Sequence, residues 1–288
     1  MNITGSQNER LSQKNQRGGC RLSLHALTLS DSCGKLICGT VSIRFHNYTI
    51  LSPTCQIYVF AVSISCLIRM LIMYYELAMT IAAALGFVYG AFRYLQPHKP
   101  LYASMIVLGT GCIALGHLYS FLRLMTGFSS SGVFHVGILG TIGAFSFFFS
   151  ANYGQIDSLV DDGREDYNKY RLIPFIPVAV IILMYIWIMM SPATAAERTT
   201  DGIAAIFIGA AAYFHMKHLV IPDVDYGVVR CQRGYNALAL AYGLLCMTEK
   251  GLIAYGINDM LLFVCISQCI ITLFMIPVMD KGVRAWSR

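Results

Sequence analysis

Charge is scarce in this sequence. Asp, Glu, Lys and Arg make up only 12% of its 288 residues, whereas apolar residues make up 56%. A water-soluble domain carries about twice that share of charged residues, so the composition excludes an ordinary soluble protein. The low charge predicts that most side chains face lipid or one another.

Known catalytic motifs are also absent from the sequence. It contains no Gly-rich phosphate loop, no GxSxG turn for a serine nucleophile and no HExxH zinc-binding pair. The last apolar segment lacks a lysine that could form a Schiff base with retinal. We therefore predict no enzyme activity, no cofactor and no bound metal.

The cysteines and basic residues indicate neither a metal nor a nucleic acid. Four of the ten cysteines have neither CxxC spacing nor a set of histidine partners. The net charge of +6 comes from basic residues scattered among loops, without the basic stripe that nucleic-acid binding requires. These patterns predict free thiols and no nucleic-acid partner. The other six cysteines lie in or beside apolar segments and are Cys66, Cys112, Cys231, Cys246, Cys265 and Cys269.

The sequence does contain a series of long apolar segments from Glu76 to near its C-terminus. A bilayer core about 30 Å thick needs about 20 such residues per helix. Because lipid offers the backbone no hydrogen-bond partners, continuous segments of this length span it as α-helices. We predict an all-α, polytopic transmembrane bundle with seven core helices, surrounded by the lipid bilayer. The expected ranges are 76–94, 101–122, 132–151, 172–190, 201–221, 235–255 and 259–279.

The chain before this bundle divides into two parts. Residues 1–55 are rich in Ser, Asn and Arg and lack the order of a secretory signal, so we interpret them as a disordered or non-native extension. Residues 56–75 are apolar apart from Arg69. They have three interpretations: a helix outside the membrane or along its surface, an eighth span with a sharp break near Tyr74–Glu76, or a segment foreign to the native protein. The seven-helix domain is predicted to cover residues 76–288.

Lys and Arg predict which loops face the cytoplasm. The turn after the first expected span holds two of them, and the loops after the third and fifth spans and the C-terminal tail hold three each. The opposite loops hold only Arg123, Arg198 and Lys250. Cytoplasmic loops are the ones enriched in Lys and Arg. We therefore predict a multi-pass protein of the cell membrane, with the start of its first span outside and its C-terminus in the cytoplasm.

Small residues predict how the helices pack. They let two backbones approach closely, which favours association where lipid competes for apolar contacts. The segment 172–190 has one Ala and no Gly, so we expect it to lie at the periphery, between two groups of three helices. A similarity between residues 81–92 and 203–214 would suit such a repeat, although chance also produces it. The small residues are Gly86 and Gly90, then Gly109, Gly111 and Gly116, then Gly137, Gly140 and Gly143, and finally Ala205 and Gly209.

Polar side chains at similar depth near the outer face predict a ligand site. His117, His135 and Glu249 come from three different spans, and Tyr242 would line the same space. Ionisable groups inside a membrane are costly and usually functional, and imidazoles with carboxylates can bind a cation, a proton or a small polar ligand. The alternative is structural, because polar side chains near helix ends reach water or bond to a neighbouring helix.

Two further features lie at the inner side. His215 and His218 share one helix face because they are three residues apart, and with Lys217 we interpret them as a basic cluster that contacts anionic headgroups. The loop 153–171 contains Asp157, Asp161 and Asp162 without the spacing of an EF-hand. We interpret this loop as a solvated connector or as the contact surface for a cytoplasmic partner.

Three functional hypotheses follow from these patterns. The first is a small-molecule or ion transporter with a polar cup near the outer face. The second is a sensory or regulatory membrane module that signals through a separate partner chain. The third and weaker hypothesis is a membrane-embedded enzyme that uses histidine and carboxylate groups.

Overall fold

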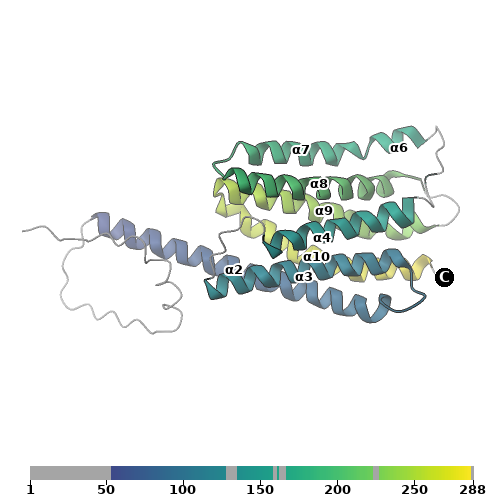
Figure 1. Cartoon of the computed structure of the whole chain (residues 1–288), viewed down its shortest axis with the longest axis horizontal. Helices are drawn as coiled ribbons and strands as arrows, with labels where there is room; N and C mark the ends of the chain where they lie inside the picture. The colour runs from purple at the N-terminus through teal and green to yellow at the C-terminus, as the bar shows by residue number, and fades with distance from the viewer. Residues whose placement is uncertain (1–52, 128–134, 158–160, 162–166, 223–226, 287–288) are drawn as a thin grey trace, which may run out of the picture. The chain divides into compact units, whose positions relative to one another are not determined.

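A computed structural model describes residues 53–127, 135–157, 161, 167–222 and 227–286 (Figure 1), and these residues contain helices and no strand. They belong to one compact unit, residues 47–288. The predicted extension 1–55 lies almost entirely outside the described residues. The helices are α2 (Pro53–Tyr94), α3 (Leu101–Thr126), α4 (Val136–Ala151), the π-helix η1 (Asn152–Asp157), α6 (Asn168–Leu172), α7 (Phe175–Met189), α8 (Ala195–Val220), α9 (Val228–Tyr255) and α10 (Asn258–Trp286).

The described part of the chain has seven segments long and apolar enough to cross a bilayer. This confirms the predicted all-α bundle of a multi-pass membrane protein. The first span is Met70–Tyr94, the C-terminal part of α2. Helix α2 continues through Tyr74–Glu76 without interruption, so the break that an eighth span would need is not there.

Helix boundaries differ from the predicted ones where local signals extend a helix. Helix α8 begins at Ala195 and not at Asp201, because Thr194 and Glu197 form a capping box. The Thr194 side chain accepts from the Glu197 backbone N–H, while the Glu197 carboxylate accepts from the Thr194 backbone N–H. Gly227 and Gly256 adopt positive φ at the two ends of α9, a conformation that glycine adopts without strain.

Six of the helices form a closed ring. Following the chain, α2 packs on α3 and α3 on α4, and α8 packs on α9 and α9 on α10. Contacts between α2 and α10 and between α4 and α8 join the two groups of three. Helix α7 packs against α8 and α9, and Figure 1 shows it at the edge of the bundle. This is the predicted arrangement of three helices, a peripheral helix and three helices.

Large apolar side chains cover the outside of the bundle. Phe92 of α2, Leu183 of α7 and Phe263 of α10 have 78%, 65% and 72% of their surface exposed. A soluble protein rarely exposes so much contiguous apolar surface. The surface is therefore the one expected of a protein surrounded by hydrocarbon.

Glycines bring α3 and α4 into backbone contact. A Cβ atom on Gly140 would lie 2.7 Å from both the Cys112 carbonyl oxygen and the Gly116 Cα. The prediction of small-residue packing is confirmed for this pair and for Gly90, where a Cβ would meet Val107 at 2.5 Å. It is wrong for Gly209, because a Cβ there would have no atom within 4 Å.

Gly140 and Gly209 give a matched test of the packing. Gly140→Ala should destabilise the protein by about 1–3 kcal/mol, the usual cost of overpacking, because the atoms in its way belong to backbone. Gly209→Ala should be neutral or stabilising by up to about 1 kcal/mol, because alanine favours the helix and has room. Thermal unfolding in detergent checks both, and an equal effect of the two substitutions would contradict the α3–α4 contact.

Candidate functional site

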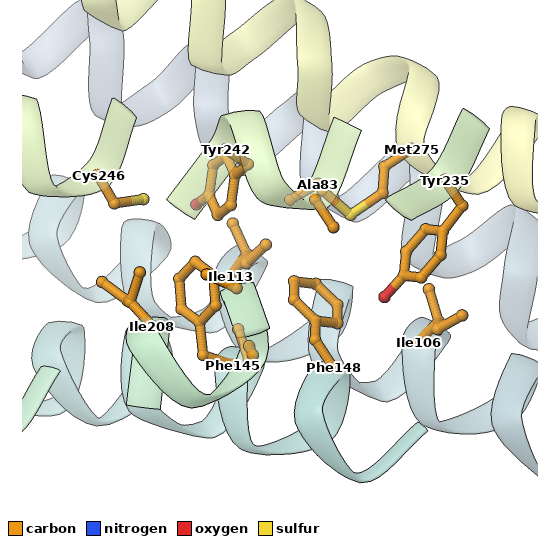
Figure 2. Close-up of a cluster of buried hydrophobic side chains, with 14 of the residues drawn as sticks. Ala83, Ile106, Ile113, Phe145, Phe148, Ile208, Tyr235, Tyr242, Cys246 and Met275 are labelled. Atoms are coloured by element: carbon orange, nitrogen blue, oxygen red, sulfur yellow. The ribbon is translucent and has the colours of Figure 1, made fainter. Parts of the chain in front are cut away.

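An apolar layer fills the middle of the ring. Figure 2 shows Phe145 and Phe148 of α4 pointing toward Tyr242, Ala83 and Met275 on the opposite helices. Phe145 stacks on Tyr242 with ring centroids 5.8 Å apart. All of these side chains are buried. Polar groups lie on both sides of this layer along the helices.

The first polar cluster lies on one side of the layer, toward the end of the bundle where α10 begins. Its members are Tyr75 and Glu76 of α2, His117 of α3, Glu249 of α9 and Gln268 of α10, so both three-helix groups contribute. The His117 Nδ1 lies 2.6 Å from the Glu76 Oε2. The Gln268 Nε2 donates to the Glu249 Oε2 at 2.9 Å.

Tyr75 connects the two halves of the first polar cluster. Its hydroxyl donates to the Gln268 Oε1 and lies 3.4 Å from the Glu249 Oε2. Its ring meets the His117 imidazole edge-on, with centroids 5.7 Å apart. The structure therefore brings the predicted site residues His117 and Glu249 into one cluster. Two carboxylates and one imidazole give this cluster groups that can exchange a proton.

The other two predicted ligand residues lie elsewhere. Tyr242 belongs to the apolar layer through its contact with Phe145. His135 precedes α4, where it stacks on Tyr119 at 6.0 Å, and its Nδ1 is buried without a partner. Burial and the charges of Arg123 and Lys250 lower the pKa of His135, which favours the neutral imidazole.

The second polar cluster lies on the other side of the apolar layer, toward the end of the bundle where α8 and α10 finish. Its members are Asn152, Asp157, His215, Lys217, His218 and Asn236. The side chains of His215, Asn152 and Asn236 are fully buried. The Asn152 Nδ2 lies 2.8 Å from the His215 Nδ1 and 3.1 Å from the Asn236 Oδ1. The cluster therefore joins α8 and α9 to the end of α4.

Acidic side chains close the second polar cluster on its outer side. Lys217 pairs with Asp157 at 2.6 Å and with Asp161 at 2.7 Å. Burial raises the pKa of Asp157, but its contacts with His218 and Lys217 outweigh burial and lower the pKa overall. Two of the three acidic residues predicted to contact a partner are thus paired within the chain, while Asp162 lies outside the described residues.

The prediction that His215, Lys217 and His218 contact lipid headgroups is wrong. Both imidazoles have none of their surface exposed, and Lys217 has 4%. Helix α8 turns this face toward α4 and η1, where the partners are Asn152 and Asp157. The spacing of the two histidines showed a shared face but not which way that face points.

A third group of polar residues surrounds Asp280 of α10 at the same end of the bundle. The Asp280 cluster is Tyr89, Arg93, Tyr94, Asp280 and Arg284. The Arg93 Nε lies 2.6 Å from the Asp280 Oδ1, and both tyrosine hydroxyls donate to this carboxylate. Asp280 is fully buried, so these contacts compensate its charge and join α2 to α10.

Sequence reasoning missed the residues that complete these clusters. Gln268, Asn152 and Asn236 are uncharged, and a search for ionisable groups in apolar segments passes over them. Asp280 lies one residue beyond the expected end of the last span, although α10 continues to Trp286. Among the described residues, no group of three His, Cys, Asp or Glu side chains is placed to hold a metal ion.

The Asp157 contacts give a prediction about pH. The pKa of the Asp157 carboxyl is lower in the folded state than its ordinary value of 3.8. Its charge therefore stabilises the fold fully at pH values above 3.8, and this stabilisation disappears as the pH falls through the pKa of the folded state. Asp157→Asn should therefore cost about 1.5–3 kcal/mol at pH 7, as for hydrogen bonds to charged groups. The difference from the wild type should shrink as the pH falls from about 5 to 3.

Thermal unfolding in detergent at a series of pH values measures this difference. The exposed Asp259 at the opposite end of the bundle supplies the control, Asp259→Asn, which should change little. A difference between Asp157→Asn and wild type that stays constant across this pH range would show that the Asp157 charge does not stabilise the fold.

No protein-family model, no curated protein and no solved structure matches this chain. The interpretation of its polar clusters therefore depends on their own geometry.

Proposed function

We propose that this protein is a transporter for a small polar solute, in which the two three-helix groups move relative to each other. The observation that carries the proposal is the first polar cluster. It places the carboxylates of Glu76 and Glu249 inside the ring, on opposite three-helix groups, with Tyr75 and Gln268 between them. A purely structural bundle gains little from charged groups at this depth, since each must be compensated.

The apolar layer favours a mechanism in which the helices move and argues against a permanent pore. Phe145, Phe148 and Tyr242 separate the first polar cluster from the second. On α9 the separation from Asn236 to Glu249 amounts to about 20 Å at 1.5 Å per residue. A solute would pass this layer only if the two groups separate first at one end and then at the other. In the structure the two groups are in contact at both ends.

Polar contacts at the C-terminal end of the bundle support the view that the two three-helix groups are structurally equivalent. Arg93 of α2 contacts Asp280 of α10, and His215 of α8 contacts Asn152 at the end of α4. The similarity of residues 81–92 to 203–214 places Arg93 in register with His215. Both contacts between the three-helix groups thus carry a polar pair with at least one fully buried member at the same end, as a repeat predicts.

A proton suits the first polar cluster as the coupling ion. His117 and Glu249 each already have a polar partner in this cluster, Glu76 and Gln268. Protonation of Glu249 would weaken its contact with Gln268 across the α9–α10 pair. Solute movement and ion movement would then share one cluster.

The membrane and orientation are part of the proposal. The C-terminal end of the bundle holds most of the Lys and Arg residues, including Lys99, Arg230 and Lys281, whereas the opposite end holds Arg123, Arg198 and Lys250. We assign the basic end to the cytoplasm of the cell. The first polar cluster then lies toward the outside.

Flux through purified protein in liposomes tests the proposed function. Vesicles that contain the pH dye pyranine receive a panel of small polar solutes from outside, with the membrane potential held at zero. We expect at least one solute to drive proton entry, and Glu249→Gln to slow it at least tenfold because the exchangeable proton is lost. Lys250→Gln, next to Glu249 but paired with Asp201, is the control and should retain flux.

Other outcomes separate the competing functions. Solute binding without movement of solute or protons across the membrane would favour the sensory module and contradict transport. Chemical conversion of a solute in detergent would favour an enzyme. Protease access to a C-terminal tag in intact cells, where none is expected, would contradict the proposed orientation.

A further inference from the structure

We propose that the two three-helix groups separate first at the end of the bundle where α10 begins, and that the Tyr75 hydroxyl is the contact that keeps this end closed. We call it the Tyr75 end and the opposite one the Asp280 end. This inference rests on the proposed transport function, because it gives the order of the two openings. It comes from a different observation, which is the unequal distribution of polar contacts between the groups.

A single hydroxyl makes the polar contacts between the groups at the Tyr75 end. Tyr75 of α2 donates to the Gln268 Oε1 of α10 and lies 3.4 Å from the Glu249 Oε2 of α9. Among the residues that the structure describes, no other polar side chain at this end contacts the opposite group. The polar connection there thus depends on one side chain of α2.

The pairs of ionisable side chains at the Tyr75 end lie within the groups and not between them. His117 of α3 contacts Glu76 of α2 at 2.6 Å, and both helices belong to the first group. Lys250 of α9 contacts Asp201 of α8 at 2.6 Å, and both helices belong to the second group. Separation of the groups at this end would leave both pairs intact.

Charged side chains join the groups at the Asp280 end. Arg93 of α2 and two tyrosines of the same helix hold the Asp280 carboxylate of α10. At the other contact between the groups, Lys217 of α8 pairs with Asp157 of η1 at 2.6 Å. Further hydrogen bonds between the groups at this end join Tyr102 to Gln232 and Asn152 to Asn236.

The number and charge of these contacts determine which end opens more readily. Hydrogen bonds to charged groups contribute more to stability than those between neutral groups. The loss of one neutral hydrogen bond changes an equilibrium constant roughly two- to tenfold. Opening at the Asp280 end requires the loss of several contacts together, and two of its carboxylates would lose cationic partners. The apolar layer lies between the two ends, so opening at the Tyr75 end requires less free energy.

The order of opening determines from which side the first polar cluster is reached. Under the proposed orientation, the Tyr75 end faces the outside. Release of Tyr75 from Gln268 would separate Glu76 on one group from Glu249 on the other. A solute from outside would then reach these carboxylates while the Asp280 end stays closed.

Distances between spin labels in the full-length protein in liposomes test this proposal. Labels replace the exposed residues Met125 and Met260 at the Tyr75 end and Lys99 and Arg230 at the Asp280 end. Unnatural amino acids carry them, so that the native cysteines stay unlabelled. Tyr75→Phe keeps the ring and removes the hydroxyl. We expect the open fraction at the Tyr75 end to rise roughly two- to tenfold, with the distance at the Asp280 end unchanged.

Two matched variants make the same chemical change elsewhere on α2. Tyr89→Phe removes one hydrogen bond to Asp280, but Arg93 and Tyr94 still hold this carboxylate, so neither distance should change. Tyr74→Phe alters the exposed neighbour of Tyr75 and should also leave both distances unchanged. Thermal unfolding shows whether each variant is folded.

A second variant approaches the Tyr75 contact from the opposite group. Gln268→Leu removes the acceptor of the Tyr75 hydroxyl and should raise the open fraction at the Tyr75 end in the same direction. It replaces Tyr75→Phe in the test if the latter does not fold.

Unchanged distances at the Tyr75 end, lengthening at both ends, or equal responses to Tyr75→Phe and Tyr89→Phe would overturn the proposal. These distances are independent of flux. The expected pattern without flux of any solute would retain the Tyr75 contact and reject transport. Flux in a protein whose Tyr75→Phe variant keeps the wild-type distances would retain transport and reject the role of Tyr75.

Discussion

Hydrocarbon gives polar side chains no hydrogen-bond partners, and this constraint explains where the polar groups of the protein lie. Each buried charge must find its partner inside the ring. Asp280 is surrounded by Arg93 and two tyrosines, and Lys217 by Asp157 and Asp161. The outside of the ring can then present Phe92 and Phe263 to lipid. The polar clusters are thus also the contacts that hold the helices together.

These contacts occur where the two three-helix groups meet. Within a group, glycines bring helices together through backbone contact, as at Gly116 and Gly140. Between groups, hydrogen bonds also join the helices, as between Tyr75 and Gln268 or between Asn152 and His215. Tight backbone packing cannot rearrange without being lost, whereas polar pairs can exchange one partner for another. The contacts between the groups therefore include polar pairs that can exchange partners.

The sequence predicted the features that depend on composition alone. The spans were predicted from hydropathy and the peripheral helix from its lack of glycine. Each of these properties is an average over many residues, so it can be read from composition. His117 and Glu249 were found because ionisable residues in apolar segments are conspicuous. The direction in which a helix face points is not an average, so His215 and His218 were assigned to lipid although they point inward. Gly209 shows the same limit, since a small residue permits close packing but does not require it.

The separation of the two three-helix groups tests this account most directly. Spin labels would replace the exposed residues Lys99 and Arg230 at the C-terminal end and Met125 and Met260 at the opposite end, and electron–electron resonance would give the distance within each pair. Asp280→Asn removes the charge that joins α2 to α10. The account predicts that this substitution lengthens the first distance and shortens the second. Unchanged distances at both ends, or lengthening at both, would contradict it.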